Sequence, residues 1–325
     1  MSANTSLDFF KKGFNGFHDS WRYIIGFIVI FVFWQIIGYI PFLSTIVVRE
    51  EFFGDGFNMH ILSNMMTLLS PNLTFFLLLL SFVFGMVGVY LMVKNLHQQN
   101  ILSSLTARSK FDWKRFIFSF ILISIFLIMS TLIDYWSNPS HYEIGFEWQS
   151  FLILSVIAIV MVPLQTTFEE WLFRGYLMQG FGYIFKNRAV PFIVTSLLFG
   201  LMHFANPEVE KLGNIIMINY IGVGVFLAII TLMDEGTELA AGFHAANNLI
   251  TALLVTADWM AFNTPSILKD VSEPEVTYDV LLPVFVLYPI LIIIMAKKYK
   301  WNNWSYKLFG KIKLNNDFTN NLPEK

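Results

Sequence analysis

Long apolar segments recur along this chain of 325 residues, and they restrict its fold more than any other feature. About eight of them approach the ~20 residues that a helix needs to cross a ~30 Å hydrocarbon core. They lie near residues 23–41, 73–93, 116–136, 148–165, 189–205, 215–233, 239–257 and 280–296. Only 14% of the residues are charged, which is well below the share in soluble domains. The sequence therefore predicts an all-α membrane bundle of about eight transmembrane helices, with residues 1–325 forming one integral membrane domain.

Lysines and arginines collect in alternate loops, and this pattern predicts the orientation of the helices. Basic residues lie before the first apolar segment, between the second and third, between the fourth and fifth, and after the last. Because cytoplasmic loops are enriched in Lys and Arg, both termini of this multi-pass protein are expected in the cytoplasm. Residues 1–22 and 297–325 combine aromatic and basic side chains. These ends are expected either to lie on anionic lipid as amphipathic segments or to act as ordinary aromatic anchors at the interface.

Three short polar sets interrupt the apolar segments between residues 148 and 257. Ionisable residues cost roughly 2.5–3.5 kcal/mol each inside a membrane helix, so they tend to persist where they face one another, water or a substrate. Residues 148–257 are therefore predicted to hold the helices of a hydrolytic site. The three sets are Glu169, Glu170 and Arg174; Phe199 and His203; and His244 and Asn248.

The first set is expected to separate into an ion pair and a free carboxylate. Neighbouring residues on a helix point ~100° apart, whereas residues four apart share a face. Arg174 follows Glu170 by four residues and is expected to pair with it. Glu169 is then left to face a pocket, where it would serve as a base. The alternative is a helix end that emerges into water with a solvated cluster of charges.

Two of the six histidines, His203 and His244, lie inside apolar runs. His244 and Asn248 are four residues apart and share a helix face. Glu169 and His203 could activate a water molecule, while His244 and Asn248 donate hydrogen bonds to the oxyanion that forms on a peptide carbonyl. Phe199, one turn before His203, is expected to pack in the core. An open alternative is a zinc site formed by Glu169, His203 and His244.

Other hydrolytic chemistries find no support in the sequence. The chain has no cysteine, which excludes a cysteine nucleophile and thiolate metal ligands. It contains neither the His-Glu-x-x-His pattern of many zinc proteases nor the Gly-x-Ser-x-Gly turn of serine hydrolases.

The ordered patterns Glu-Glu-x-x-x-Arg, Phe-x-x-x-His and His-x-x-x-Asn resemble those of the CPBP family, which contains CAAX proteases and bacteriocin-processing enzymes and is also called the Abi family. The resemblance covers about residues 148–257. It implies an eight-helix, CAAX-protease-like intramembrane endopeptidase whose site opens to the cytoplasm. In the family, the first glutamate and the histidine of the second motif activate water, and the histidine and asparagine of the third motif support the oxyanion. The positions implied as catalytic are Glu169, His203, His244 and Asn248, and those implied as supporting are Glu170, Arg174 and Phe199.

The resemblance also sets the expected chemistry and partners. Family members have been described both as metalloproteases and as glutamate-dependent proteases without a catalytic metal. We expect the metal-free mechanism without a cofactor, and zinc is the alternative. The expected partners are membrane lipid and a peptide or protein substrate, with no nucleic acid. High usage of Phe, Ile and Asn indicates an AT-rich genome, so the protein is expected in the inner membrane of a bacterial cell.

Two non-proteolytic functions stay open on the sequence alone. A non-catalytic immunity or scaffold protein of the same fold would bind a peptide or partner in its cavity. A transporter or channel would use Glu169 and the histidines as a proton relay. The chain shows no internal repeat, which argues against a transporter built from inverted halves.

Overall fold

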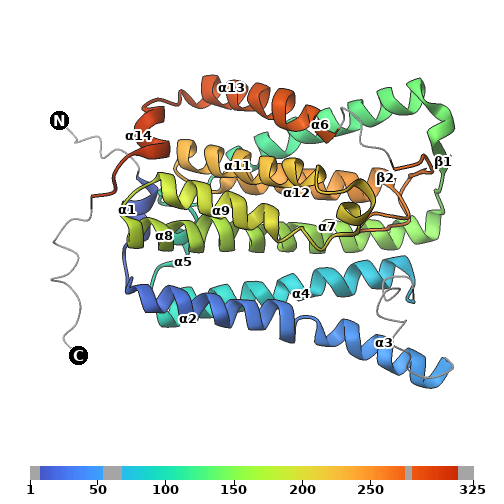
Figure 1. Cartoon of the computed structure of the whole chain (residues 1–325), viewed down its shortest axis with the longest axis horizontal. Coiled ribbons are helices and arrows are strands. Elements are labelled where there is room, and N and C mark those ends of the chain that lie inside the picture. The colour runs from blue at the N-terminus through green and yellow to red at the C-terminus, as the bar shows by residue number, and fades with distance from the viewer. Residues whose placement is uncertain (1–7, 54–67, 275–279, 314–325) are drawn as a thin grey trace.

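The computed structural model describes residues 8–53, 68–274 and 280–313. Its elements are nearly all helices, which confirms the predicted class. Figure 1 shows the long helices lying side by side along one direction. In chain order the elements are α1 (Phe9–Gly13), α2 (Ser20–Phe31), η1 (Val32–Ile37), α3 (Ile40–Phe53), α4 (Pro71–Leu91), η3 (Met92–Leu96), α5 (Ile101–Leu105), α6 (Trp113–Ser137), η4 (Pro139–His141), β1 (Tyr142–Ile144), α7 (Trp148–Glu170), η5 (Trp171–Leu177), α8 (Met178–Phe185), α9 (Ala189–Leu201), α10 (Pro207–Leu212), α11 (Ile216–Asp234), α12 (Glu238–Leu254), β2 (Val255–Thr256), β3 (Leu268–Asp270), η7 (Pro283–Leu287), α13 (Tyr288–Tyr299) and α14 (Trp304–Phe309).

Five helical stretches in the described residues are long and apolar enough to cross a membrane. Each coincides with one predicted span, and the remaining three predicted spans fall on shorter helices, namely α9, α12, and η7 followed by α13. The chain is therefore a polytopic helix bundle. The five long stretches are Ser20–Arg49, Pro71–Leu96, Trp113–Ser137, Trp148–Phe185 and Ile216–Asp234.

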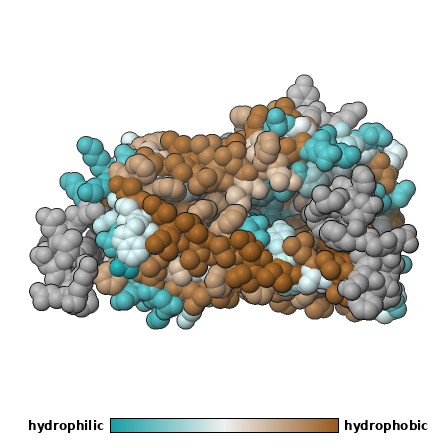
Figure 2. All heavy atoms as spheres, turned by 60° about the horizontal axis from the view of Figure 1, so that its bottom comes forward, coloured by the Kyte–Doolittle hydropathy of each residue, from teal (hydrophilic) through white to brown (hydrophobic). Residues whose placement is uncertain are grey.

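The long helices present apolar side chains outward as well as inward. On α7, Leu154 and Ala158 are buried, whereas Val156, Ile159 and Val160 are exposed. Figure 2 shows that hydrophobic residues cover the middle of one face of the molecule and that hydrophilic residues gather toward its ends. An exposed apolar surface of this extent marks contact with a membrane rather than with water.

The centre of the bundle is built around α7 and α12. Helix α12 packs along both α6 and α7, α4 packs against α7, and α9 packs against α11. The three motif-bearing segments, on α7–η5, α9 and α12, therefore belong to helices that are neighbours in space as well as in sequence. A short sheet lies at one end of the bundle, where β3 pairs antiparallel with β1 and parallel with β2.

The fourth span is longer than the sequence predicted. It was expected to end near residue 165, but α7, η5 and α8 form one helical stretch of 38 residues, Trp148–Phe185. The turn η5 is π-helical, and all seven of its residues are buried. The charged motif therefore lies inside the protein, and the alternative of a solvated helix end is wrong.

Helix α1 packs into the protein through its phenylalanines, although the N-terminal segment was expected at the membrane interface. Phe9 and Phe10 are fully buried and pack against residues of α8 and α11. The Phe9 backbone N–H donates to Glu235 Oε2 at 2.6 Å, and Asp8 pairs with Arg188 at 2.9 Å. These anchors explain the difference from the expected interfacial segment, because they hold α1 against the turn that follows α11.

Candidate active site

Glu169, Glu170 and Arg174 lie where α7 passes into the π-helical turn η5. Their exposed fractions are 6%, 1% and 0%. Arg174 Nη1 donates to Glu170 Oε1 at 3.1 Å, so the predicted pair along the helix is confirmed. A buried ion pair persists because each charge replaces the hydration that the other has lost.

Arg174 is also fixed by two neighbouring helices. Its Nη2 donates to the Gly224 carbonyl of α11 at 3.2 Å. Its guanidinium carbon lies 4.2 Å from the centre of the Phe199 ring on α9. Arg174 therefore joins η5, α9 and α11. Phe199 is 2% exposed and packs as a core residue, as the sequence predicted.

His244 on α12 lies between the two glutamates. Its Nδ1 is 2.8 Å from Glu170 Oε1, and its Nε2 is 3.3 Å from Glu169 Oε2. The imidazole of His244 thus links Glu169 to the buried Glu170–Arg174 pair.

His203 lies just after the end of α9 and is half-buried. Its Nδ1 is 2.8 Å from the Phe199 carbonyl, so this nitrogen carries the proton and donates it. The neutral ring then has its lone pair on Nε2, which has no hydrogen-bond partner among the described residues. The ring stacks on Tyr220 of α11, with centroids 4.6 Å apart. His203 thus offers an acceptor nitrogen of fixed orientation.

Glu169 and His203 were expected to act together on one water molecule, but they do not contact each other directly. The histidine that touches Glu169 is His244, and no direct bond joins Glu169 to His203 within the described residues. The Phe199 ring lies beside both imidazoles, with centroids 5.0 Å from His203 and 5.7 Å from His244. Phe199 therefore packs against both histidines.

Gln165 is a polar residue of this cluster that the sequence analysis did not identify. Its Nε2 donates to Glu169 Oε2 at 2.9 Å, and its Oε1 accepts from Asn248 Nδ2 at 3.1 Å. Asn247 Nδ2 in turn donates to Asn248 Oδ1 at 3.1 Å. The three amides thus donate in one direction, from Asn247 on α12 to the Glu169 carboxylate on α7. The available signal was an amide one helical turn before Glu169 in an apolar helix.

A zinc site would need three protein ligands around one ion. Both histidines hold an oxygen through Nδ1, an orientation that is common in metal-ligating histidines. Within residues 8–53, 68–274 and 280–313, however, no group of three His, Asp or Glu side chains is placed to hold one ion. Glu169, His203 and His244 therefore do not fit a metal ion in this arrangement.

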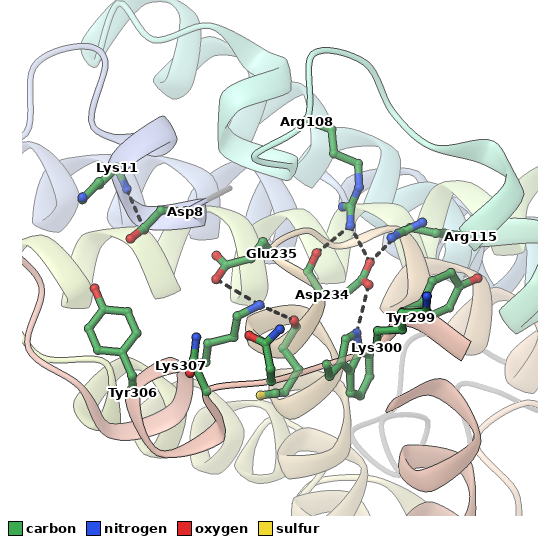
Figure 3. Close-up of a pocket in the computed structure, with 14 residues that line it drawn as sticks. Asp8, Lys11, Arg108, Arg115, Asp234, Glu235, Tyr299, Lys300, Tyr306 and Lys307 are labelled. Atoms are coloured by element: carbon green, nitrogen blue, oxygen red, sulfur yellow. Dashed lines mark hydrogen bonds and ion pairs between the residues drawn. The ribbon is translucent and has the colours of Figure 1, made fainter. Parts of the chain in front are cut away.

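The polar cluster does not line either of two cavities elsewhere in the structure. One cavity, of about 350 Å³, lies beside α14 and the end of α11 and is shown in Figure 3. The other, of about 640 Å³, lies near the starts of α4 and α7. Within the cluster, His203, Asn247 and Asn248 are half-buried while the glutamates are buried. These three residues mark the side on which the cluster is most accessible.

Comparisons with known proteins match the part of the chain that carries the three motifs. Residues 148–250 match the family described as type II CAAX prenyl endopeptidase, Rce1-like. The chain is also 30% identical over 254 residues to the uncharacterized protein YyaK of Bacillus subtilis (strain 168), a match that covers 77% of this chain and 83% of that relative. No solved structure matches the chain.

Proposed function

Because the chain belongs to the CPBP family of CAAX-type membrane proteases, we propose that it is an intramembrane endopeptidase that hydrolyses peptide bonds of membrane-associated peptides or proteins. Its helices make it an integral membrane protein, and its family makes it a peptidase. The proposed location is the inner membrane of a bacterial cell with both termini in the cytoplasm. We further propose that the mechanism is glutamate-based and needs no metal.

The proposed reaction begins with a water molecule held near Glu169 and His203. Glu169 accepts a proton from this water while the lone pair of His203 Nε2 orients it for attack on the peptide carbonyl. Once Glu169 has taken the proton, the Nε2–H of His244 turns from Glu169 to the oxyanion, and the amide N–H of Asn248 that is not donated to Gln165 also donates to it. The proton on Glu169 then passes to the leaving amine, which restores the carboxylate.

The contact between Glu169 and His244 is the observation that carries this proposal. A carboxylate and an imidazole 3.3 Å apart, buried and held by Gln165 and by the Glu170–Arg174 pair, form a preorganised site for proton transfer. Preorganised polar groups in a water-poor site lower a barrier because they need little rearrangement as charge develops. A cluster with a purely structural role would not need half-buried polar members such as His203 and Asn248.

The proposal is tested by cleavage of a membrane-peptide library by the full chain in liposomes. Glu169→Gln preserves side-chain volume and removes the base, so we expect loss of cleavage by at least about 100-fold. Glu210→Gln is the matched control, because Glu210 is exposed on α10, and it should cleave like wild type. Equal cleavage by Glu169→Gln and wild type would remove Glu169 from the mechanism.

A non-catalytic binding protein of the same fold makes the opposite prediction. In that case wild type cuts nothing, and Glu169→Gln leaves the biological activity intact. The same vesicles can be loaded with a pH dye to measure proton flux across the membrane. Flux that wild type shows and Glu169→Gln lacks would instead support the transporter hypothesis.

Metal dependence is decided on the same samples. Under the metal-free mechanism, a zinc chelator leaves the cleavage rate within about twofold of the untreated rate, and the metal content of active protein stays far below one ion per chain. Loss of activity on chelation and recovery with zinc would instead assign Glu169, His203 and His244 as ligands of a rearranged site.

A further inference from the structure

A charged cavity of about 350 Å³ lies where four parts of the chain meet, and none of the motif residues lines it. Figure 3 shows Asp8 and Lys11 of the N-terminal segment on one side and Arg115 and Tyr299 on the other. Arg108 and the Asp234–Glu235 turn lie between them. The lining contains five cationic and three carboxylate side chains, so it carries a net positive charge of two. The cationic ones are Lys11, Arg108, Arg115, Lys300 and Lys307.

The carboxylates of this cavity are occupied by the protein itself. Asp234 Oδ2 accepts from Arg108 and Arg115, both at 2.8 Å, and its Oδ1 accepts from Trp301 at 3.1 Å. Glu235 is equally engaged, since its Oε2 accepts a backbone N–H and its Oε1 lies 3.4 Å from Lys307 Nζ. Asp8 pairs with the buried Arg188. The acidic groups therefore offer little to a ligand.

Two exposed lysines of the lining have unpaired ammonium groups. Lys11 Nζ and Lys300 Nζ have no ion-pair or hydrogen-bond partner in the part of the chain that the structure describes. Lys300 ends α13 in a left-handed conformation, with φ 53°, and this turn directs the chain around the cavity. A cavity whose carboxylates are paired and which also offers unpaired ammonium groups is suited to an anion.

The ends of α6, α11 and α13 meet at this cavity, and because α6 and α11 are long and apolar enough to cross a membrane, their ends place it at the boundary of the bilayer. Asp234 is the last residue of α11, Arg115 lies in the first turn of α6, and Tyr299 is the last residue of α13. Trp301 and Tyr306, also in the lining, are the side-chain types enriched at that boundary. Lipid phosphates of the cytoplasmic leaflet lie at this level, and basic pockets between membrane helices recognise them.

We propose that this cavity binds the phosphate group of an anionic phospholipid from the cytoplasmic leaflet, with Lys11 and Lys300 as its direct ligands. Arg115 extends the positive wall, and its guanidinium lies 4.2 Å over the Tyr299 ring. The occupied cavity would brace the Asp234–Glu235 turn, which leads directly into α12 and its His244. The site is separate from the proposed proteolytic cluster and does not depend on it.

The site is tested by titrating the full chain in detergent with dihexanoylphosphatidylglycerol and measuring the binding affinity by calorimetry. The variant Lys11→Ala combined with Lys300→Ala should bind at least about tenfold more weakly than wild type, because two charge-assisted contacts are lost. The matched control is Lys12→Ala combined with Lys297→Ala, which removes two exposed lysines that lie one and three residues from Lys11 and Lys300 but outside the lining. This control should bind like wild type.

Inorganic phosphate and dihexanoylphosphatidylcholine complete the experiment. Both should bind more weakly than the anionic lipid, phosphate because it lacks the glycerol body and phosphatidylcholine because its cation meets a positive wall. Equal binding of inorganic phosphate would overturn the lipid assignment in favour of a soluble phosphate ligand. Equal binding of phosphatidylcholine would overturn the preference for an anionic headgroup, and equal affinity of the lining variant and wild type would overturn the site itself.

Discussion

Arg174 is held on three sides, and a lysine cannot reproduce its contacts. The guanidinium donates to Glu170 and to the Gly224 carbonyl while its flat face lies against Phe199. Arg174→Lys keeps the charge but loses the second donor direction and the planar contact. We predict a loss of about 1–3 kcal/mol in stability together with reduced cleavage. Thermal unfolding in detergent measures the loss, and Arg49→Lys at an exposed position is the control. Wild-type unfolding of Arg174→Lys would contradict this role.

Gln165 positions two groups of the proposed site at once, since it donates to Glu169 and accepts from Asn248. Gln165→Met keeps the volume of the side chain and removes both bonds. We predict that kcat falls about 10- to 100-fold while KM stays nearly unchanged, as for other residues that orient a reacting group. Gln165→Glu retains the oxygen that Asn248 needs but turns the donor toward Glu169 into an acceptor, so it should not rescue the rate. An equal rise in KM would indicate a role in substrate binding instead.

Some of these residue contacts could be predicted from sequence because they lie within one helix. The pairing of Glu170 with Arg174 follows from a spacing of four residues alone. The placement of His244 between both glutamates depends on how α12 packs against α7. The distances from His244 to Glu169 and Glu170 therefore cannot be derived from the spacing of residues in the sequence. Gln165 was missed for a related reason, because its importance appears only when Asn248 is brought to it from another helix.

At the scale of elements, the position of α12 depends on a close approach to α6. A Cβ atom on Gly242 would lie 2.2 Å from the Phe116 carbonyl oxygen, so the two backbones touch at this point. We predict that Gly242→Ala moves α12, lowers stability by about 1–3 kcal/mol and reduces cleavage, since His244 lies two residues further on. Gly145→Ala is the control, because its nearest neighbour would be 3.6 Å away. Melting temperature and cleavage rate should change for the first variant only.

The helices themselves were predictable from hydrophobicity, but their ends were not. The fourth span was expected to stop near residue 165, before the charged motif. In the structure it continues to Phe185, because Glu170 and Arg174 neutralise each other and π-helical turn η5 packs against α5, α8 and α9. A hydropathy argument counts each charge as a cost and cannot include a partner that removes that cost.

The N-terminal segment shows the same limit at the scale of the whole molecule. Its phenylalanines suggested contact with lipid, yet Phe9 and Phe10 join a buried cluster with residues from α8, α11 and the C-terminal segment. Aromatic content predicts that a segment lies in an apolar environment, but it does not distinguish lipid from the protein interior. The long-range hydrogen bond from the Phe9 backbone N–H to Glu235 places Phe9 in the protein interior.

His18 makes this N-terminal packing sensitive to acid. The ring is 6% exposed, and its Nδ1 lies 2.6 Å from the Tyr23 hydroxyl. Burial, with a further contribution from nearby His97, lowers the pKa of His18 from 6.5 to about 3, and Asp19 opposes the shift only weakly. Between these values the unfolded chain binds the proton and the folded chain does not. Stability is therefore fully retained above pH 6.5 and falls progressively as the pH drops toward 3.

The slope expected from one such proton is about 1.4 kcal/mol per pH unit. We predict that the apparent melting temperature of wild type falls between pH 6.5 and 4.5, and that His18→Gln, which still offers Tyr23 a hydrogen-bond partner, falls less steeply. Buried carboxylates such as Glu235 also titrate in acid, but they are common to both proteins and cancel in the difference. His141→Gln, at an exposed histidine, should follow wild type. If His18→Gln and wild type lose stability in parallel, another group must set the response of the protein to acid.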